Sequence, residues 1–243
     1  MTTSTQPLWL EADLEAVEQQ VLSIQQEINA ISGFSFGRYV TSPLARGVLS
    51  AARLHRAGPN QRQYLAAAFE LLLLANRIHN QLHLDNSTET NPVAQVLAGD
   101  AIFAQSALLA AAVENIAVMR SFSNMVLILS EENLRLLLES ESAQCSTTMW
   151  MRVYAEGLGA SGQLCNLGGN EIAALRSFGE HLGYIVALRT GASASPIESL
   201  SQHVTDALDD LIPLPEGEAK QQLNDLIMDL VSAGIENRNL TTQ

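Results

Sequence analysis

Apolar residues recur at alternating steps of four and three positions over the first thirty residues of the chain. This spacing places them along one side of an α-helix of about six turns, and Gly33 follows where such a helix would end. The apolar stripe consists of Leu10, Leu14, Val17, Val21, Ile24, Ile28 and Ile31. We therefore predict that residues 1–36 form an N-terminal helix and loop.

The sequence after this helix repeats the signals of helix starts. Ser42-Pro43 and Asn91-Pro92 each place a capping side chain before a proline at the first helical position. Asn60 and Asn170 are predicted to cap two further helices. No alternating run of β-branched residues interrupts these signals, so strands are not expected.

Residues 93–130 are apolar on nearly all sides. This pattern predicts one or two helices buried at the centre of the protein, with another helix starting at Ser130. Together the signals predict an all-α fold of about ten helices. We expect a single domain over residues 1–243, in which residues 37–243 form the bundle.

The most apolar part of the central segment, residues 107–119, contains Glu114. It is shorter than the ~20 apolar residues of a membrane-spanning helix, so no membrane span is predicted. The formal net charge of −13 would repel phosphate backbones, and nucleic acid is therefore not an expected partner. Cys145 and Cys165 lack metal-site spacing, and the N-terminus lacks the basic region of a signal peptide. We predict a cytoplasmic protein.

Two local motifs are more specific than the helix pattern, Leu97-Ala98-Gly99-Asp100 and Phe178-Gly179-x-x-Leu182-Gly183. The other segments that accompany them, in chain order, are residues 66–72 with Ile78-His79, the pair Gly159-Ala160, and residues 207–223. In this order the segments resemble those of the trans-prenyl (polyprenyl) diphosphate synthases. The resemblance covers residues 38–240 and implies an isoprenoid-synthase-like bundle.

The resemblance fails at the two aspartate-rich clusters that the family carries. The five positions of the first cluster hold Asn80, Gln81, Leu82, His83 and Leu84, and those of the second hold Thr190, Gly191, Ala192, Ser193 and Ala194. Asn80, Gln81 and Leu84 therefore mark a degenerate first cluster. Thr190, Gly191 and Ala194 mark a degenerate second cluster.

In that family the clusters hold Mg²⁺, which neutralises the diphosphate that leaves an allylic substrate. Two carboxylates four residues apart on a helix point to the same side and grip the ion together. Without them we expect no bound Mg²⁺, no cofactor and no catalytic residue. The resemblance therefore implies a degenerate homologue, a non-catalytic or regulatory subunit of isoprenoid biosynthesis.

Family members dimerise through central helices, so the resemblance also implies a homodimer or a heterodimer with a catalytic prenyl diphosphate synthase. The apolar segment 93–128 would supply the contact face. Two alternatives stay open: a binder of an isoprenoid or other apolar ligand in the helical cavity, and a prenyltransferase with residual or altered activity. A helical interaction scaffold unrelated to the family is a further alternative.

Other polar residues are interpreted as structural. His79 and His83 share one helical side, but would need a third ligand to bind zinc. Asp100 is predicted to cap a helix or to bond within the core, and Glu70 to pair with Arg77 or a neighbouring donor. The remaining acidic group, on a predicted solvated helix face, consists of Asp206, Asp209 and Asp210.

Overall fold

The computed structural model describes residues 6–55, 57–84, 91–138, 145–191 and 197–240. Over these residues the chain forms nine α-helices and no strand, which confirms the all-α prediction. The helices are α1 Leu8–Ser32, α2 Pro43–Ala52, α3 Pro59–Leu84, α4 Pro92–Ala112, α5 Ile116–Leu138, α6 Thr147–Leu164, α7 Gly169–Arg189, α8 Ile197–Asp210 and α9 Glu218–Leu240.

The predicted start of a helix at Ser130 is wrong, because α5 runs through this position without a break. The interruption in the central segment lies earlier, at residues 113–115. There Glu114 takes a positive φ of 55°, and the Asn115 side chain accepts hydrogen bonds from the next helix's backbone N–H groups. Asn115 is the N-cap that the sequence reading missed.

Proline and asparagine signals predicted two of the helix starts correctly. Ser42 and Asn91 cap α2 and α4 with their side chains, as predicted. Two other predicted caps are wrong by one or two residues. Helix α3 already begins at Pro59, so Asn60 lies inside it. Helix α7 begins at Gly169, so Asn170 lies inside it as well. At the start of α7 the Glu171 carboxylate accepts a hydrogen bond from the Gly168 backbone N–H.

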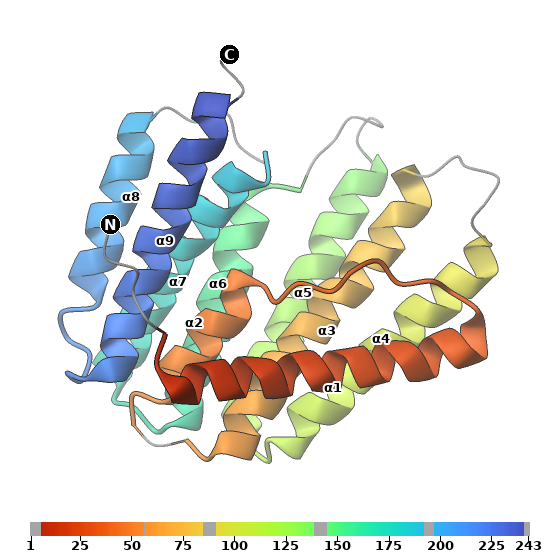
Figure 1. The fold of residues 1–243 in the computed structure, drawn as a ribbon, viewed down its shortest axis with the longest axis horizontal. Helices are drawn as coiled ribbons and strands as arrows, with labels where there is room; N and C mark the ends of the chain where they lie inside the picture. The colour runs from red at the N-terminus through yellow and green to blue at the C-terminus, as the bar shows by residue number, and fades with distance from the viewer. Residues whose placement is uncertain (1–5, 56, 85–90, 139–144, 192–196, 241–243) are drawn as a thin grey trace.

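The N-terminal helix forms as predicted and ends at Gly33, whose φ of +69° favours glycine. Most of its apolar stripe is buried, but Ile31, in the last turn of the helix, is 87% exposed. Figure 1 shows α1 lying across one side of the other helices. A buried ion pair between Asp13 and Arg62 fastens it to α3.

Helix α6 lies at the centre and packs along α7, α5 and α2. In Figure 1, α4 forms one edge of the bundle, and α8 and α9 form the opposite edge. The interior between them is filled by large side chains that solvent does not reach, among them Phe69, Tyr154 and Phe178. These helices hold the ends of α3 and α7 at the same end of the bundle.

The prediction that residues 93–130 are buried on all sides is wrong for α4. One side of α4 packs on α3 and α1, and the other exposes an almost wholly apolar stripe. Its large exposed side chains are Val93, Val96, Leu97, Phe103 and Leu108. By length and composition α4 is also the one described helix apolar enough to cross a membrane, with a mean hydropathy of 1.5, although helices of soluble bundles reach the same value.

Candidate functional site

The positions of the degenerate first cluster lie on the last turn of α3. Asn80 is half-buried there, while the side chains of residues 81–84, including Gln81 and Leu84, lie outside the described part. The helix continues to Leu84, so positions 80 and 84 share one helical side. The helical backbone on which the sequence reading placed a first cluster is therefore present, and positions 80 and 84 hold an amide and an alkyl residue.

The positions of the degenerate second cluster differ in backbone as well as in side chains. Helix α7 ends at Arg189, and Thr190 is its C-cap residue. The Thr190 hydroxyl donates to the carbonyl of Ala187 at 3.1 Å, so it turns back toward its own helix. Gly191 follows with a left-handed φ of +79°, and Ala194 lies outside the described residues. Thr190 and Gly191 thus do not continue α7.

These residues do not fit a magnesium site of the kind that the fold family uses. Mg²⁺ requires charged oxygen ligands in near-octahedral geometry, and Asn80, Thr190 and Gly191 supply no carboxylate. Across the described ranges, no three His, Cys, Asp or Glu side chains are grouped so that they could hold a metal ion. The absence of Mg²⁺ from the working protein stays a prediction.

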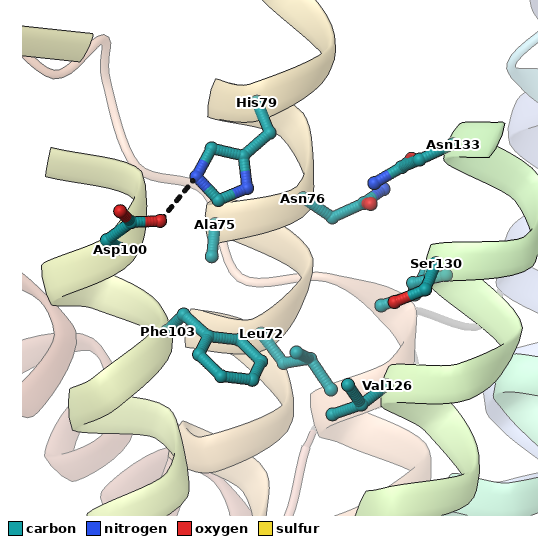
Figure 2. A pocket seen from close by; sticks show the side chains of 10 residues that line it. Leu72, Ala75, Asn76, His79, Asp100, Phe103, Val126, Ser130 and Asn133 are labelled. Atoms are coloured by element: carbon teal, nitrogen blue, oxygen red, sulfur yellow. Dashed lines mark ion pairs between the residues drawn. The ribbon is translucent and has the colours of Figure 1, made fainter. Parts of the chain in front are cut away.

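A cleft of about 220 Å³ opens between α4 and α5, with α3 as its floor, and we call it the α4–α5 cleft (Figure 2). Its lower part is apolar, and its upper part is polar. The apolar lining consists of Leu72, Ala75, Phe103, Val126 and Leu129, and the polar lining of Asn76, His79, Asp100, Ser130 and Asn133.

Two amides face one another in the upper part of this cleft, Asn76 from α3 and Asn133 from α5 (Figure 2). The Oδ1 atom of each is inaccessible to solvent and has no hydrogen-bond partner. A buried amide oxygen without a donor costs roughly 1–3 kcal/mol. Because solvent does not reach either oxygen, both atoms lie behind the surface of the cleft.

An ion pair lies at the mouth of the cleft, where Nε2 of His79 is 3.3 Å from Oδ1 of Asp100. The prediction that Asp100 caps a helix or bonds within the core is wrong, since its side chain is exposed. Gly99 explains the arrangement, because the His79 ring occupies the space where a Cβ on residue 99 would stand. The pair joins two segments that resemble the prenyl synthases, while His83 lies outside the described side chains.

Glu70 is buried in the middle of α3, as the sequence predicted, but Arg77 is not its hydrogen-bond partner. The carboxylate accepts bonds from the Tyr39 hydroxyl at 2.9 Å and from both the backbone N–H and the hydroxyl of Ser42. Burial raises the pKa of Glu70, and these bonds only partly offset that effect. The group joins α3 to the start of α2.

The sequence reading missed a polar cluster where α8 packs on α7. Nδ1 of His181 lies 2.7 Å from Nδ1 of His203, and the Tyr184 ring stacks on His203 with centroids 3.7 Å apart. Asp210, predicted to lie on a solvated face, instead turns toward α7, with Oδ2 3.6 Å from His181 Nε2. Residues this far apart in sequence give no local signal of such contact.

A second hollow, of about 350 Å³, lies on the outer surface over α5, α6 and α7. Three of its four charged side chains pair: Glu156 with Arg176 at 2.8 Å, and Arg152 with Glu131 at 2.8 Å. Gly159 leaves the space that the Arg176 guanidinium occupies. This Gly-Ala position of the resemblance therefore serves packing between helices.

The helices and their order are those of the isoprenoid synthase fold, the fold of the trans-prenyl diphosphate synthases. The geranyl diphosphate synthase small subunit of Antirrhinum majus is similar over 90% of this chain and 97% of its own, with a TM-score of 0.72 and 16% identity. The geranylgeranyl pyrophosphate synthase of Bacteroides thetaiotaomicron is similar over 91% of this chain and 96% of its own, with a TM-score of 0.69 and 19% identity.

A deletion mutant of the heterotetrameric geranyl pyrophosphate synthase of mint is also similar, over 92% of this chain and 99% of that one, with a TM-score of 0.64 and 18% identity. The sequence itself matches no protein-family model and no curated protein. At these identities the comparisons establish the fold, and the activity has to be argued from the site.

Proposed function

We propose that this chain is a non-catalytic subunit of isoprenoid biosynthesis that pairs with a catalytic prenyl diphosphate synthase. The observation that carries the proposal is the state of the two helix ends, where a prenyl-synthase fold supplies no carboxylate at Asn80, Thr190 or Gly191. Loss of even ~4 kcal/mol of leaving-group stabilisation slows ionisation about a thousandfold. The replacement of both clusters therefore argues against prenyl transfer by this chain alone.

The exposed apolar stripe of α4 supports the pairing. Leu97 and Leu108 of α4 are 57% and 62% exposed, and α5 also exposes Leu127 and Leu134. Contiguous apolar surface of this kind marks a protein interface more often than free surface. The similarity to a small subunit and to a heterotetrameric synthase, by their printed names, is in keeping with a partner chain.

The filled interior argues against the alternative of an isoprenoid bound along the centre of the bundle. Phe69, Tyr154 and Phe178 occupy the space between the helices. An apolar ligand would need a cavity lined by smaller side chains. A cytoplasmic location is part of this proposal, and both described cysteines are free.

Two experiments test the proposal. In the first, the chain is co-expressed with each catalytic prenyl diphosphate synthase of its source and purified through a tag on the chain. We expect one synthase to co-purify, and Leu97→Glu or Leu108→Glu to abolish this. Ile212→Glu, at a 70% exposed position away from α4, is the matched control.

In the second experiment the isolated chain is assayed with dimethylallyl or farnesyl diphosphate, isopentenyl diphosphate and Mg²⁺. No product is expected. Turnover comparable to that of a catalytic synthase would overturn the non-catalytic assignment. If none of the synthases associates with the chain, the subunit assignment is wrong. The mass of the isolated chain in solution distinguishes a monomer from a homodimer.

A further inference from the structure

Helix α8 lies at the edge of the bundle, and over the described residues α7 is the only helix on which it packs closely (Figure 1). Among residues 199–210 only Ala207 is buried, while Val204 and Leu208 are half-buried. A helix of 14 residues is only marginally stable in water without tertiary packing. The attachment of α8 therefore depends on a small apolar contact and on the polar contacts that accompany it.

Two histidines form one of these polar contacts. Nδ1 of His181 lies 2.7 Å from Nδ1 of His203, and at this distance one ring donates its hydrogen to the other. Two imidazole nitrogens bound to one tetrahedral zinc ion would stand about 3.3 Å apart, because each Zn–N bond is ~2.0 Å long. The separation is therefore that of a hydrogen bond and not that of two metal ligands.

This hydrogen bond tolerates one added proton but not two. In the neutral pair one Nδ1 carries a hydrogen and the other does not. A first added proton goes to the Nε2 atom of the donor ring and leaves the bond in place. A second added proton goes to the Nδ1 atom that accepts the bond, so that two N–H groups of like charge face one another. The doubly protonated pair therefore loses the bond and gains a repulsion.

The neighbouring groups determine which ring takes up the second proton. Burial and the neighbouring His181 lower the pKa of His203, while Asp206 on α8 opposes this effect. Oδ2 of Asp210 lies 3.6 Å from Nε2 of His181, the atom on which the first added proton would reside. His203 is therefore the ring that is protonated last, at a pH below the ordinary pKa of histidine.

The other titratable groups at this contact do not replace the lost bond. Burial raises the pKa of Asp210, so acid also weakens the attraction of its carboxylate for the His181 ring. Glu180 and Asp209, next to these two residues in sequence, are exposed, and water screens their charges. Acid therefore weakens the contact between α7 and α8 at both ends of the histidine pair.

We propose that the His181–His203 pair is an acid-sensitive switch that holds α8 on α7 while one Nδ1 is unprotonated and releases α8 when both are protonated. In the attached state the Tyr184 ring is buried and stacks on His203 with centroids 3.7 Å apart. Release exposes this ring and the side of α8 that carries Val204 and Leu208, at the edge of the bundle opposite α4 (Figure 1). The inference goes beyond the proposed function and requires no partner chain.

Hydrogen exchange of the full chain, followed by mass spectrometry and corrected for the intrinsic exchange rate, tests the switch. The protection of α8 amides should fall about tenfold between pH 7.5 and 5.5, because the released helix binds the second proton with an ordinary histidine pKa. This opening should not depend on low concentrations of urea, whereas amides of the central α6 exchange through global unfolding, which urea promotes. His203→Gln takes up no proton at this position, so its α8 amides should show no such fall.

Tyr184→Phe is the matched control, because it weakens the same contact without changing its titration. The Tyr184 hydroxyl lies 2.7 Å from the Ser199 hydroxyl, and phenylalanine removes this hydrogen bond but leaves both histidines in place. The α8 amides of the variant should be less protected than those of the wild-type chain by the same factor at both pH values. The tenfold dependence on pH should persist.

Three results would overturn the switch. They are a protection of α8 that does not change with pH, a fall of equal size in His203→Gln, and exchange of α8 only together with α6. The last result would mean that the histidines act on the stability of the whole bundle and that α8 does not detach by itself. None of these measurements involves a synthase, so the switch and the subunit role are tested separately.

Discussion

Gly179 on α7 lies against the backbone of Tyr154 on α6 so closely that a Cβ would stand 2.5 Å from the Tyr154 carbonyl oxygen. Gly183, one turn further on, would place a Cβ 2.7 Å from Cα of Met151. At these two glycines the backbones of α6 and α7 are therefore in direct contact. Neither neighbour can give way by rotating a side chain.

The first prediction follows from this contact. Gly179→Ala or Gly183→Ala should cost about 3 kcal/mol or more of unfolding free energy, because the helices must separate to admit the methyl group. Urea denaturation of the purified variants measures this. Gly169→Ala, at the open start of α7 with nothing within 4 Å, serves as control and should be neutral or slightly stabilising. Equal stability of the three variants would contradict the close contact.

The contact at Gly179 and Gly183 also shows what the sequence could and could not predict. Phe178-Gly179-x-x-Leu182-Gly183 resembles a segment that precedes a catalytic cluster, and here it determines how α6 and α7 pack. Local caps and apolar spacing predicted the all-α fold because each depends on neighbours in sequence. The exposed side of α4 was predicted to be buried, since composition cannot tell a helix buried on all sides from one that exposes an apolar side.

Site residues were harder to predict for a related reason. The positions of Asn80 and Thr190 followed from chain order, but the end of α7 at Arg189 depends on a turn at Gly191 that no periodic pattern reveals. Likewise, the pairing of His181 with His203, and the opposed amides Asn76 and Asn133, arise only when separate helices meet.

The second prediction concerns the buried Glu70. Because burial raises its pKa in the folded state, the folded chain binds more protons than the unfolded chain above about pH 4.5. The stabilising effect of that proton is present at low pH and is lost as the pH rises through the folded pKa. Within this window the unfolding free energy should fall by up to about 1.4 kcal/mol per pH unit.

Glu70→Gln removes this titration, while its amide still accepts bonds from Tyr39 and Ser42. The variant should therefore be at least as stable as the wild-type chain at pH 8, with the advantage shrinking toward pH 5. Urea unfolding at several pH values measures the difference, and Glu27→Gln on an exposed face of α1 is the control. A wild-type chain that is clearly more stable than Glu70→Gln at pH 8 would refute it.

The third prediction concerns the contact between His181 of α7 and His203 of α8. Burial and the neighbouring His181 lower the pKa of His203, so the folded chain binds fewer protons than the unfolded chain below about pH 6.5. This contribution to stability is complete above pH 6.5 and is lost as the pH falls through the folded pKa. The short bond between the imidazoles also requires that one Nδ1 remain unprotonated.

Two carboxylates, those of Asp206 and Asp210, act on this pair of histidines. Asp206 lies on the same helix as His203 and favours its protonation, while burial raises the pKa of Asp210, which makes the Asp210 contribution grow as the pH falls. His203→Gln should abolish the loss of stability between pH 7.5 and 5.5 that is due to the histidine and leave the opposite Asp210 effect. Urea unfolding with imidazole NMR titration checks this. His55→Gln, an exposed position, should retain the wild-type pH profile.

The fourth prediction distinguishes two differences at the positions compared with the family's aspartate clusters: the lack of carboxylates and the lack of a continuing helix. Asn80→Asp with Leu84→Asp places two carboxylates one turn apart on α3, which continues through both positions. Such a pair on one helical side should gain measurable Mg²⁺ affinity, because both oxygen ligands point toward the same ion. Thr190→Asp with Ala194→Asp should gain little, since α7 ends at Arg189 and Gly191 has a left-handed φ of +79°.

Isothermal titration with MgCl₂ compares the two double variants with the wild-type chain, and CaCl₂ provides a second cation of larger radius. Equal Mg²⁺ affinity in both variants would show that residues beyond Gly191 resume the direction of α7, and the backbone argument would then be wrong. Neither variant should transfer prenyl groups when supplied with dimethylallyl and isopentenyl diphosphate, because each restores one wall of a site that needs both. Detectable transfer by the α3 variant alone would contradict that requirement.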